Sequence, residues 1–178
     1  MAAGRMIRDC TPADVDAVFA VIDDAAQAYR GAIPADRWHE PYMPAAELAA
    51  EIAAGVAFRL WVEDGPNGGE RVTGVMGGQP VQDVFLIRHA YVRTARRRQG
   101  IGAALLADLV QRTDRPVLIG TWAAAAWAVR FYEKHGFRQV TPAEKDRLLR
   151  RYWTVPQRQI AASVVLADAR WFAQRGGA

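Results

Sequence analysis

The chain has 178 residues, of which 51% are hydrophobic, and 23 Lys and Arg against 19 Asp and Glu give it a formal net charge of +4 at pH 7. This length is typical of one domain with a substantial core, and no apolar run approaches the roughly 18 residues that a membrane span needs. The single cysteine, Cys10, excludes an internal disulfide, and residues 1–12 lack the apolar stretch of a secretory signal, so we expect a cytoplasmic protein.

The first third of the chain predicts a short strand and two helices. Ile7 and Arg8 suggest the strand, and Thr11-Pro12-Ala13-Asp14 forms a helix start with a hydroxyl N-cap and proline at the first helical position. Apolar residues then follow at helical spacing, namely Val15, Val18, Phe19 and Ile22. Residues 29–44, rich in aromatic residues and proline, are predicted as loop and broken helix, and residues 44–52 as the second helix.

The middle of the chain predicts β-structure. Residues 58–63 alternate between apolar and polar side chains, as a half-buried strand does. The segment DGPNGGE at residues 64–70 has turn composition, so residues 71–76 are predicted as the second strand of a hairpin. Residues 84–92 predict a longer strand.

The second half alternates between helices and strands. It predicts helices at residues 101–111, 124–135 and 142–151 and strands at residues 117–121, 137–140 and 163–166. Gly136 lies in the C′ position of the helix at residues 124–135. The last strand can extend the domain's own sheet or pair with a second subunit, which leaves a homodimer open, and the tail at residues 168–178 is expected to be loose. The pattern predicts an α/β or α+β fold with one sheet, in a single domain spanning residues 1–178 with its core at about 5–167.

A glycine-containing segment, RRRQGIG at residues 96–102, joins a predicted strand to a predicted helix. Gly100 and Gly102 allow close backbone approach and positive φ angles, so successive amides can point into one concavity. The helix adds unpaired N-terminal N–H groups and the positive end of its dipole, and the arginines add charge. The segment therefore predicts a pyrophosphate site, although neither the Walker motif GxxxxGK[ST] nor the dinucleotide motif GxGxxG is present.

These motifs resemble those of the GNAT superfamily of acyl-CoA-dependent N-acyltransferases. The family's pyrophosphate loop, written [Q/R]xxGx[G/A], matches residues 97–102, and Val92 is the hydrophobic residue expected eight positions before the first glycine. The family's later signature, a helix that carries FY and ends in GF, matches FYEKHGF at residues 131–137. The segments YRGAIPADRWHEPYM, LIRHAYV and RYWTVPQRQIAASVVL also resemble a bacterial small-molecule subgroup.

The resemblance implies a fold and a co-substrate. It implies one mixed, mostly antiparallel sheet with flanking helices, in which two central parallel strands, residues 84–92 and 117–121, splay apart around the pantetheine of acetyl-CoA. Many family members have asparagine seven residues before the tyrosine of FY, whereas this chain has Ala125, which removes one cofactor contact. The cofactor-binding residues that the resemblance implies are Tyr91, Val92, Arg97, Arg98, Gln99, Gly100, Ile101, Gly102 and Ala103. Whether the side chains of Arg96, Arg97 and Arg98 reach phosphates or only solvent stays open.

Two residues are candidates for proton transfer. The resemblance makes Tyr132 the general acid, and a phenol, which is protonated at neutral pH, can donate to a departing thiolate; the alternative is a core tyrosine. His89 has the chemistry of a general base, although it can instead be structural or position the substrate. Strand alternation puts His89 and Tyr91 on one face and Arg88, Ala90 and Val92 on the other, unless a bulge changes the parity. Glu63, Asp83 or a chain of waters are alternative bases.

The acceptor site is expected over residues 29–43, because family acceptors usually enter opposite the cofactor. Its candidate residues are Tyr29, Trp38, Tyr42 and Arg88. Aromatic rings with the acids Asp36 and Glu40 suit a cationic amine, whereas Arg30, Arg37 and Arg88 favour a substrate with a carboxylate, and the sequence leaves both open. The same aromatic residues can instead close a small core.

The resulting hypothesis is an acetyl-CoA-dependent N-acetyltransferase that acts on a primary amine of a small molecule, such as an amino acid, a polyamine or a drug-like amine, in a ternary complex. A non-catalytic acyl-CoA sensor is the main alternative, and a basic nucleic-acid-binding module is the weaker one because it leaves both motifs unexplained. We expect no nucleic-acid partner and no membrane partner. We also expect no metal, since His39, His89 and His135 lie far apart.

Overall fold

A single sheet of seven strands organises the computed structural model, which describes residues 4–65 and 68–174. The strand order is β1-β2-β3-β4-β5-β7-β6, and every neighbouring pair is antiparallel except β4–β5. The strands are β1 (Arg5–Asp9), β2 (Ala57–Asp64), β3 (Glu70–Val81), β4 (Val84–Val92), β5 (Val117–Trp122), β6 (Arg138–Gln139) and β7 (Ser163–Ala167). The predicted single mixed, mostly antiparallel sheet with one parallel pair is confirmed.

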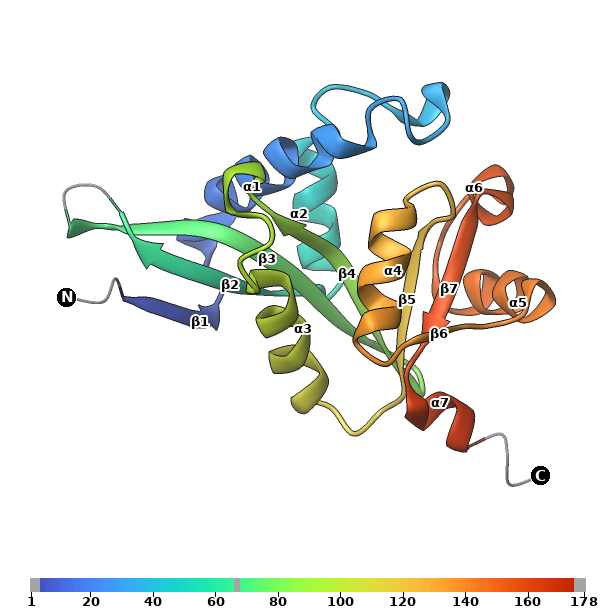
Figure 1. Cartoon of the computed structure of the whole chain (residues 1–178). Coiled ribbons are helices and arrows are strands. Elements are labelled where there is room, and N and C mark those ends of the chain that lie inside the picture. The colour runs from blue at the N-terminus through green and yellow to red at the C-terminus, as the bar shows by residue number, and fades with distance from the viewer. Residues whose placement is uncertain (1–3, 66–67, 175–178) are drawn as a thin grey trace.

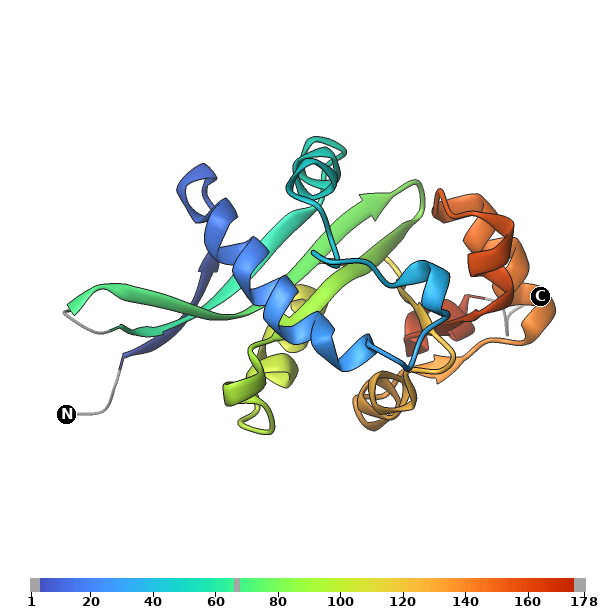
Figure 2. The same ribbon diagram turned by 90° about the horizontal axis from the view of Figure 1, so that it is seen from above.

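Helices cover both faces of this sheet (Figure 1). They are α1 (Val15–Ala26), α2 (Ala45–Ala53), α3 (Ile101–Gln111), α4 (Ala126–Lys134), α5 (Pro142–Tyr152), α6 (Gln157–Ala161) and α7 (Ala169–Ala173). Short 3₁₀ turns are η1 (Pro12–Asp14), η2 (Gln27–Tyr29), η3 (Ala35–Arg37) and η5 (Thr94–Arg96). Figure 2 shows α2 and α3 on opposite sides of the sheet. None of the described helices is both long enough and apolar enough to cross a membrane.

The core consists of three apolar clusters that follow this layering. Helices α1 and α2 pack on β2 and β3 around Leu48 and Leu60, and α3 and α4 pack on the opposite face around Leu105 and Ile119. Helix α5 covers β5 and β7 through a third cluster that includes Leu148. Side chains that alternate along each strand therefore supply both faces of the sheet, as the period-two pattern of the sequence predicts.

Most predicted elements are present, and the differences have local causes. The β2–β3 hairpin forms, although residues 66–67 of its predicted turn lie outside the described part. Strand β3 continues past Met76 to Val81, through a glycine pair that sequence patterning does not identify as strand. Glycine is required there because a Cβ on Gly78 would lie 2.3 Å from the ring of Phe85.

The C-terminal part differs more. Strand β7 inserts between β5 and β6 of the same sheet, so it extends the domain's own sheet. The prediction of a loose tail is wrong for residues 169–173, which form α7, while residues 175–178 lie outside the described part. The Asp168 carboxylate caps this helix by accepting from the Trp171 amide at 3.2 Å, and the buried Trp171 ring anchors it to the α5 cluster.

Candidate active site

The parallel strands β4 and β5 separate along their length. They pair only at Phe85 with Val117, Leu86 with Leu118, and Ile87 with Ile119. Beyond Ile87, β4 pairs only with β3, while the end of β5 pairs with β7. A cavity of about 830 Å³ lies in this opening, lined by residues of both strands and of α3 and α4. The predicted splay is therefore present, and it creates a continuous site between the two halves of the sheet.

One end of the cavity is the glycine loop that leads into α3. Gly100 has φ +81°, a left-handed conformation that glycine adopts without strain, and it directly precedes Ile101, the first residue of the helix. The first intrahelical hydrogen bond comes from the Ala104 amide to the Gly100 carbonyl, which leaves the earlier amides without partners within the helix. A Cβ on Gly102 would lie 3.4 Å from the Phe131 ring, so this stretch of backbone faces the cavity.

Eight of the nine predicted cofactor residues line the cavity; Gln99 does not. The arginine side chains are partly engaged within the protein. Arg97 donates to the Ala25 carbonyl at 3.0 Å, and the Arg96 Nε lies 3.0 Å from the Glu63 carboxylate. Loop backbone and helix terminus, together with the arginines that lie beside them, therefore give this end of the cavity the chemistry that suits an anion.

The other end is walled by aromatic side chains. The rings of Tyr29 and Tyr42 stack with centroids 5.6 Å apart, and Trp127 lies 5.5 Å from Tyr29. Trp122 donates its indole N–H to the Tyr42 hydroxyl at 3.3 Å. Burial raises the pKa of Tyr29 to about 12, so this phenol is protonated at neutral pH. Trp38 packs against Tyr42, with ring centroids 5.6 Å apart, but unlike the other three predicted acceptor residues it does not line the cavity.

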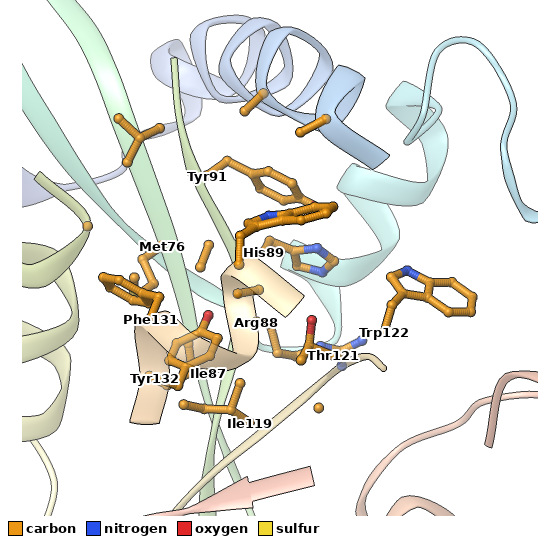
Figure 3. A pocket seen from close by; sticks show the side chains of 18 of the residues that line it. Met76, Ile87, Arg88, His89, Tyr91, Ile119, Thr121, Trp122, Phe131 and Tyr132 are labelled. Carbon is orange, nitrogen blue, oxygen red and sulfur yellow. The ribbon is translucent and has the colours of Figure 1, made fainter. Parts of the chain in front are cut away.

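Tyr132 lies between these two ends, on α4. Its side chain lines the cavity next to Phe131, whose ring centroid is 5.1 Å away, and Figure 3 shows Tyr132 and His89 reaching the same space from different elements. Burial raises the pKa of Tyr132, and the neighbouring Tyr29 raises it further. The phenol is therefore held in its protonated form, available as a hydrogen-bond donor to a group in the cavity.

A β-bulge at His89 sets which β4 side chains face the aromatic end. Val75 pairs with Tyr91 and Gly77 with Arg88, so His89 and Ala90 together oppose a single residue of β3. His89 has φ +53°, a left-handed conformation that costs a non-glycine residue roughly 1–2 kcal/mol. The bulge overturns the predicted parity of Arg88, whose side chain lies with His89 on the α2 face instead of with Ala90 and Val92.

Sequence reasoning missed the carboxylate that joins these two residues. Glu51, on α2, accepts from an Arg88 Nη at 3.0 Å, and its other oxygen lies 3.2 Å from the His89 Nε2. Its pKa is lowered mainly by the hydrogen bond from His89, which with the charge of Arg88 outweighs the opposing effect of burial. No local sequence signal could have paired Glu51 with β4, because the β2–β3 hairpin separates them in the chain.

The alternative bases that the sequence suggested lie elsewhere. Glu63 is buried beside Arg96 and accepts from the Trp61 indole at 3.4 Å, and Asp83 accepts from the Tyr152 hydroxyl at 2.7 Å. Neither residue lines the cavity. Within the part of the chain that the structure describes, no Asp or Glu side chain lines the cavity, whereas five Arg and Lys side chains do, namely Arg88, Arg96, Arg97, Arg98 and Lys134. In that same part, no three His, Cys, Asp or Glu side chains are placed to hold a metal ion.

Comparisons with known proteins agree with this geometry. Residues 57–139 match the model of a family described as acetyltransferase (GNAT) domain, a segment that runs from β2 to β6 and includes the glycine loop and Tyr132. A search of curated proteins finds no match to the chain.

Solved structures share the fold over nearly the whole chain. A PaiA N-acetyltransferase from Thermoplasma acidophilum in complex with coenzyme A is 13% identical to this chain, with a TM-score of 0.66. A GNAT-family acetyltransferase from Staphylococcus aureus Mu50 is 15% identical, with a TM-score of 0.64. Each of these two comparisons covers 93% of this chain and 98% of the other chain. The ribosomal-protein-S18-alanine N-acetyltransferase from Escherichia coli is 19% identical with a TM-score of 0.61, covering 93% of both chains. At these identities the likeness establishes a shared fold.

Proposed function

We propose that this chain, which carries a GNAT acetyltransferase domain, transfers the acetyl group of acetyl-CoA to a primary amine of a small molecule. By its family it is an acetyl-CoA-dependent N-acetyltransferase. What we propose is the chemical class of its acceptor and the roles of individual residues. One observation carries the proposal. A single cavity connects the glycine loop to an aromatic chamber and passes both Tyr132 and His89, so a CoA thioester and an amine can meet inside it.

The residues at the loop end fit the CoA moiety. The N-terminal amides of α3 and the loop before it would hold the pyrophosphate, and Arg97 and Arg98 would add positive charge beside it. Beyond Ile87, the side of β4 that faces β5 has no strand partner, so its backbone groups near Tyr91 and Val92 can bond to the pantetheine amides as another strand would. Fit to acetyl-CoA thus rests on backbone groups as much as on side chains.

The chemistry then needs an acceptor for the amine proton, a hydrogen-bond donor to the carbonyl oxygen and a hydrogen-bond donor to the leaving sulfur. Acetyl-CoA supplies the thioester carbonyl that the amine nitrogen attacks. His89 would accept the proton that the amine loses, and a β4 amide near Val92 would donate to the carbonyl oxygen as negative charge develops there. Tyr132 would donate a hydrogen bond to the sulfur as the C–S bond breaks. Because its raised pKa makes full proton transfer to a thiolate unfavourable, stabilisation through this hydrogen bond is the main role that we assign to it.

The chamber supports a small acceptor with an apolar or aromatic body. Tyr29, Tyr42 and Trp127 offer flat surfaces for such a body, and a cationic amine gains further from their π faces. A polyamine would find no carboxylate among the described lining residues to neutralise its additional charges. Among the acceptors that the sequence left open, aromatic monoamines and amino acids therefore fit better than polyamines.

A thiol-release assay with acetyl-CoA tests this proposal. The panel is phenethylamine, L-phenylalanine, spermidine and a peptide with a free N-terminal alanine, each compared with the rate of thioester hydrolysis without amine. We expect release of CoA thiol and formation of the N-acetyl product with one of the first two compounds. Transfer to the peptide in preference to every small amine would contradict the small-molecule acceptor, and binding of acetyl-CoA with no transfer to any of the four would favour the acyl-CoA sensor.

A further inference from the structure

Glu51, His89 and Arg88 form a side-chain cluster that lies outside the two family motifs at residues 97–102 and 131–137. Its three side chains are mostly withdrawn from solvent, with exposed fractions of 19% for Glu51 and 14% for His89. Arg88 and His89 both line the cavity, and Figure 3 shows them on neighbouring positions of β4. The carboxylate stands behind them on α2, outside the cavity lining. It can therefore act on the acceptor only through the two residues that it holds.

The direction of the His89 hydrogen bond follows from the chemistry of its partner. The lowered pKa of Glu51 keeps its carboxyl group ionised near neutral pH, and an ionised carboxylate can only accept hydrogen bonds. The imidazole Nε2, 3.2 Å from the carboxylate, must then carry the hydrogen. In the neutral ring the lone pair is consequently on Nδ1, for which no hydrogen bond exists among the described residues.

The rest of the cluster fixes the carboxylate in place. Arg88 bonds with one Nη to Glu51 and with the other to the Gln79 side-chain oxygen, each at 3.0 Å. Gln79 in turn donates to the Ala54 carbonyl at 2.8 Å, just after the end of α2. The Phe58 ring packs against the imidazole with centroids 6.0 Å apart. Among the described residues, Glu51 from α2 is thus the charged group that pairs with His89, Arg88 from the same strand shares that carboxylate, and β2 contributes an apolar ring.

We propose that Glu51 is a positioning residue for the transfer: it holds His89 as the Nε2–H tautomer, so that Nδ1 is the atom that takes the proton from the acceptor amine. The inference rests on the proposed function. In the step, the amine nitrogen forms a bond to the acetyl carbon while its N–H bond breaks and an Nδ1–H bond forms. The resulting imidazolium is stabilised by the Glu51 carboxylate through its Nε2–H. The thiolate keeps the electron pair of the C–S bond. The left-handed bulge at His89 turns the imidazole onto the α2 face, within reach of Glu51.

Imidazole NMR tests the tautomer without any acceptor. Two-bond ¹H–¹⁵N correlations of the ¹⁵N-labelled full chain report which nitrogen carries the hydrogen in each of the three histidines, and the His89 signals are assigned by their loss in His89→Gln. We expect neutral His89 to be the Nε2–H tautomer in the wild type. In Glu51→Gln, whose amide can donate to Nε2, the Nδ1–H form should become populated. Glu47→Gln removes the same charge from an exposed position one turn earlier on α2 and should leave the tautomer unchanged.

Kinetics with the small amine that the panel identifies test the role in transfer. Glu51→Gln should lower kcat by about 10- to 100-fold, less than the 10²–10⁴-fold that an acid–base group itself typically contributes. The KM for acetyl-CoA should stay within about twofold, because Glu51 lies away from the CoA-binding end, and Glu47→Gln should match the wild type. An Nδ1–H tautomer in the wild type, or an unchanged kcat in Glu51→Gln, overturns the inference while leaving the acetyltransferase intact. A wild type that transfers to no small amine overturns the small-molecule function, and the role of Glu51 with it.

Discussion

At the scale of single residues, the cavity is lined by tyrosine hydroxyl groups that stay protonated. Tyr29, Tyr91 and Tyr132 all have pKa values that burial raises above that of free tyrosine. Ionisation of any of them would place a negative charge on a group that is largely withdrawn from water. These phenols therefore act as donors across the physiological pH range, which suits a reaction in which negative charge passes from a carbonyl oxygen to sulfur.

Replacing Tyr132 with phenylalanine removes one such donor and leaves the ring packing in place. We expect kcat to fall by about 10²- to 10³-fold, the range typical of removing one hydrogen-bond donor from the charge that develops in the transition state, with little change in the KM for acetyl-CoA. Tyr152→Phe is the matched control, because it removes a buried hydroxyl that bonds to Asp83 outside the cavity. Steady-state kinetics of the two variants measure the effect on kcat. Equal kcat values for wild type and Tyr132→Phe would exclude the Tyr132 hydroxyl as a hydrogen-bond donor in the transfer.

Motifs predicted some of the individual residues that line the cavity, while composition predicted others, such as Tyr29 and Tyr42, less selectively. Tyr132 and the loop residues followed from short patterns, and the structure places them on the cavity. Trp38 came from aromatic composition alone, which does not distinguish a ring that faces a cavity from one that packs behind it. Simple alternation misplaces Arg88, and the bulge that the sequence left open as an alternative is the reason. Glu51 was missed because it lies on α2 and its partners lie on β4.

At the scale of elements, helix stability and ligand binding favour different residues at the N-terminus of α3. Gly102 lies in the first turn of the helix, where glycine costs roughly 0.5–1 kcal/mol relative to alanine. A Cβ there would make only ordinary contacts, at 3.4 Å from Phe131 and 3.9 Å from Val92. Folding alone would therefore favour alanine at this position. A ligand that lies against this backbone would explain the glycine, because it would leave no room for a Cβ.

The Gly102→Ala variant separates these two effects. Without ligand, its melting temperature should equal or exceed that of the wild type, because the helix gains propensity. If the pyrophosphate lies against this backbone, the affinity for acetyl-CoA should drop by about tenfold or more, equivalent to about 1.4 kcal/mol, because the added methyl group would occupy space that the ligand needs. Calorimetric titration measures the affinity. Unchanged affinity would show that the pyrophosphate does not approach this part of the loop.

An ion pair joins α3 to the sheet. The buried guanidinium of Arg59, on β2, donates to the Asp108 carboxylate at 2.7 Å, and Arg112 donates to the same carboxylate at 2.9 Å. Burial alone raises the pKa of Asp108, but these hydrogen bonds lower it below its usual value. A carboxyl group with a lowered folded-state pKa stabilises the fold above its unfolded pKa, about 3.9, and this contribution is lost as the pH falls through the folded-state value.

Asp108→Asn should therefore destabilise the protein most at neutral pH. We expect a loss of about 1–2 kcal/mol at pH 7, moderated because part of the carboxylate remains in water. The difference from the wild type should shrink as the pH falls below about 4. Denaturant titrations at pH 7, 5 and 3.5 measure it, and a difference that does not vary with pH would contradict the assigned ion pair.

Element prediction worked where the local composition or periodicity was strong. β4 and α3 have the predicted bounds, because residues 84–92 are rich in β-branched and aromatic side chains and α3 has apolar residues at helical spacing. The extension of β3 past Met76 depends on close packing against Phe85, and α7 depends on burial of Trp171 under α5. Both are tertiary effects that no local window contains.

At the scale of the whole molecule, the seven-stranded sheet has two parts, β1–β4 and β5–β7, joined at its centre by the short β4–β5 pairing (Figure 1). Since all strands belong to one sheet, we propose that residues 5–167 act as a single domain. The cavity lies where the two parts separate. A ligand bound there contacts both parts, so binding should stabilise the fold as a unit.

The shift in melting temperature with acetyl-CoA tests the central claim most directly, with ATP and NAD as phosphate-bearing controls. At about 100 times its dissociation constant, a ligand that binds only the folded state adds roughly 2.7 kcal/mol, or on the order of 5–10 °C for a chain of this size. We predict that shift with acetyl-CoA and not with ATP or NAD at the same concentration. No shift with acetyl-CoA, or an equal shift with ATP, would contradict a CoA thioester site in the cavity between β4 and β5.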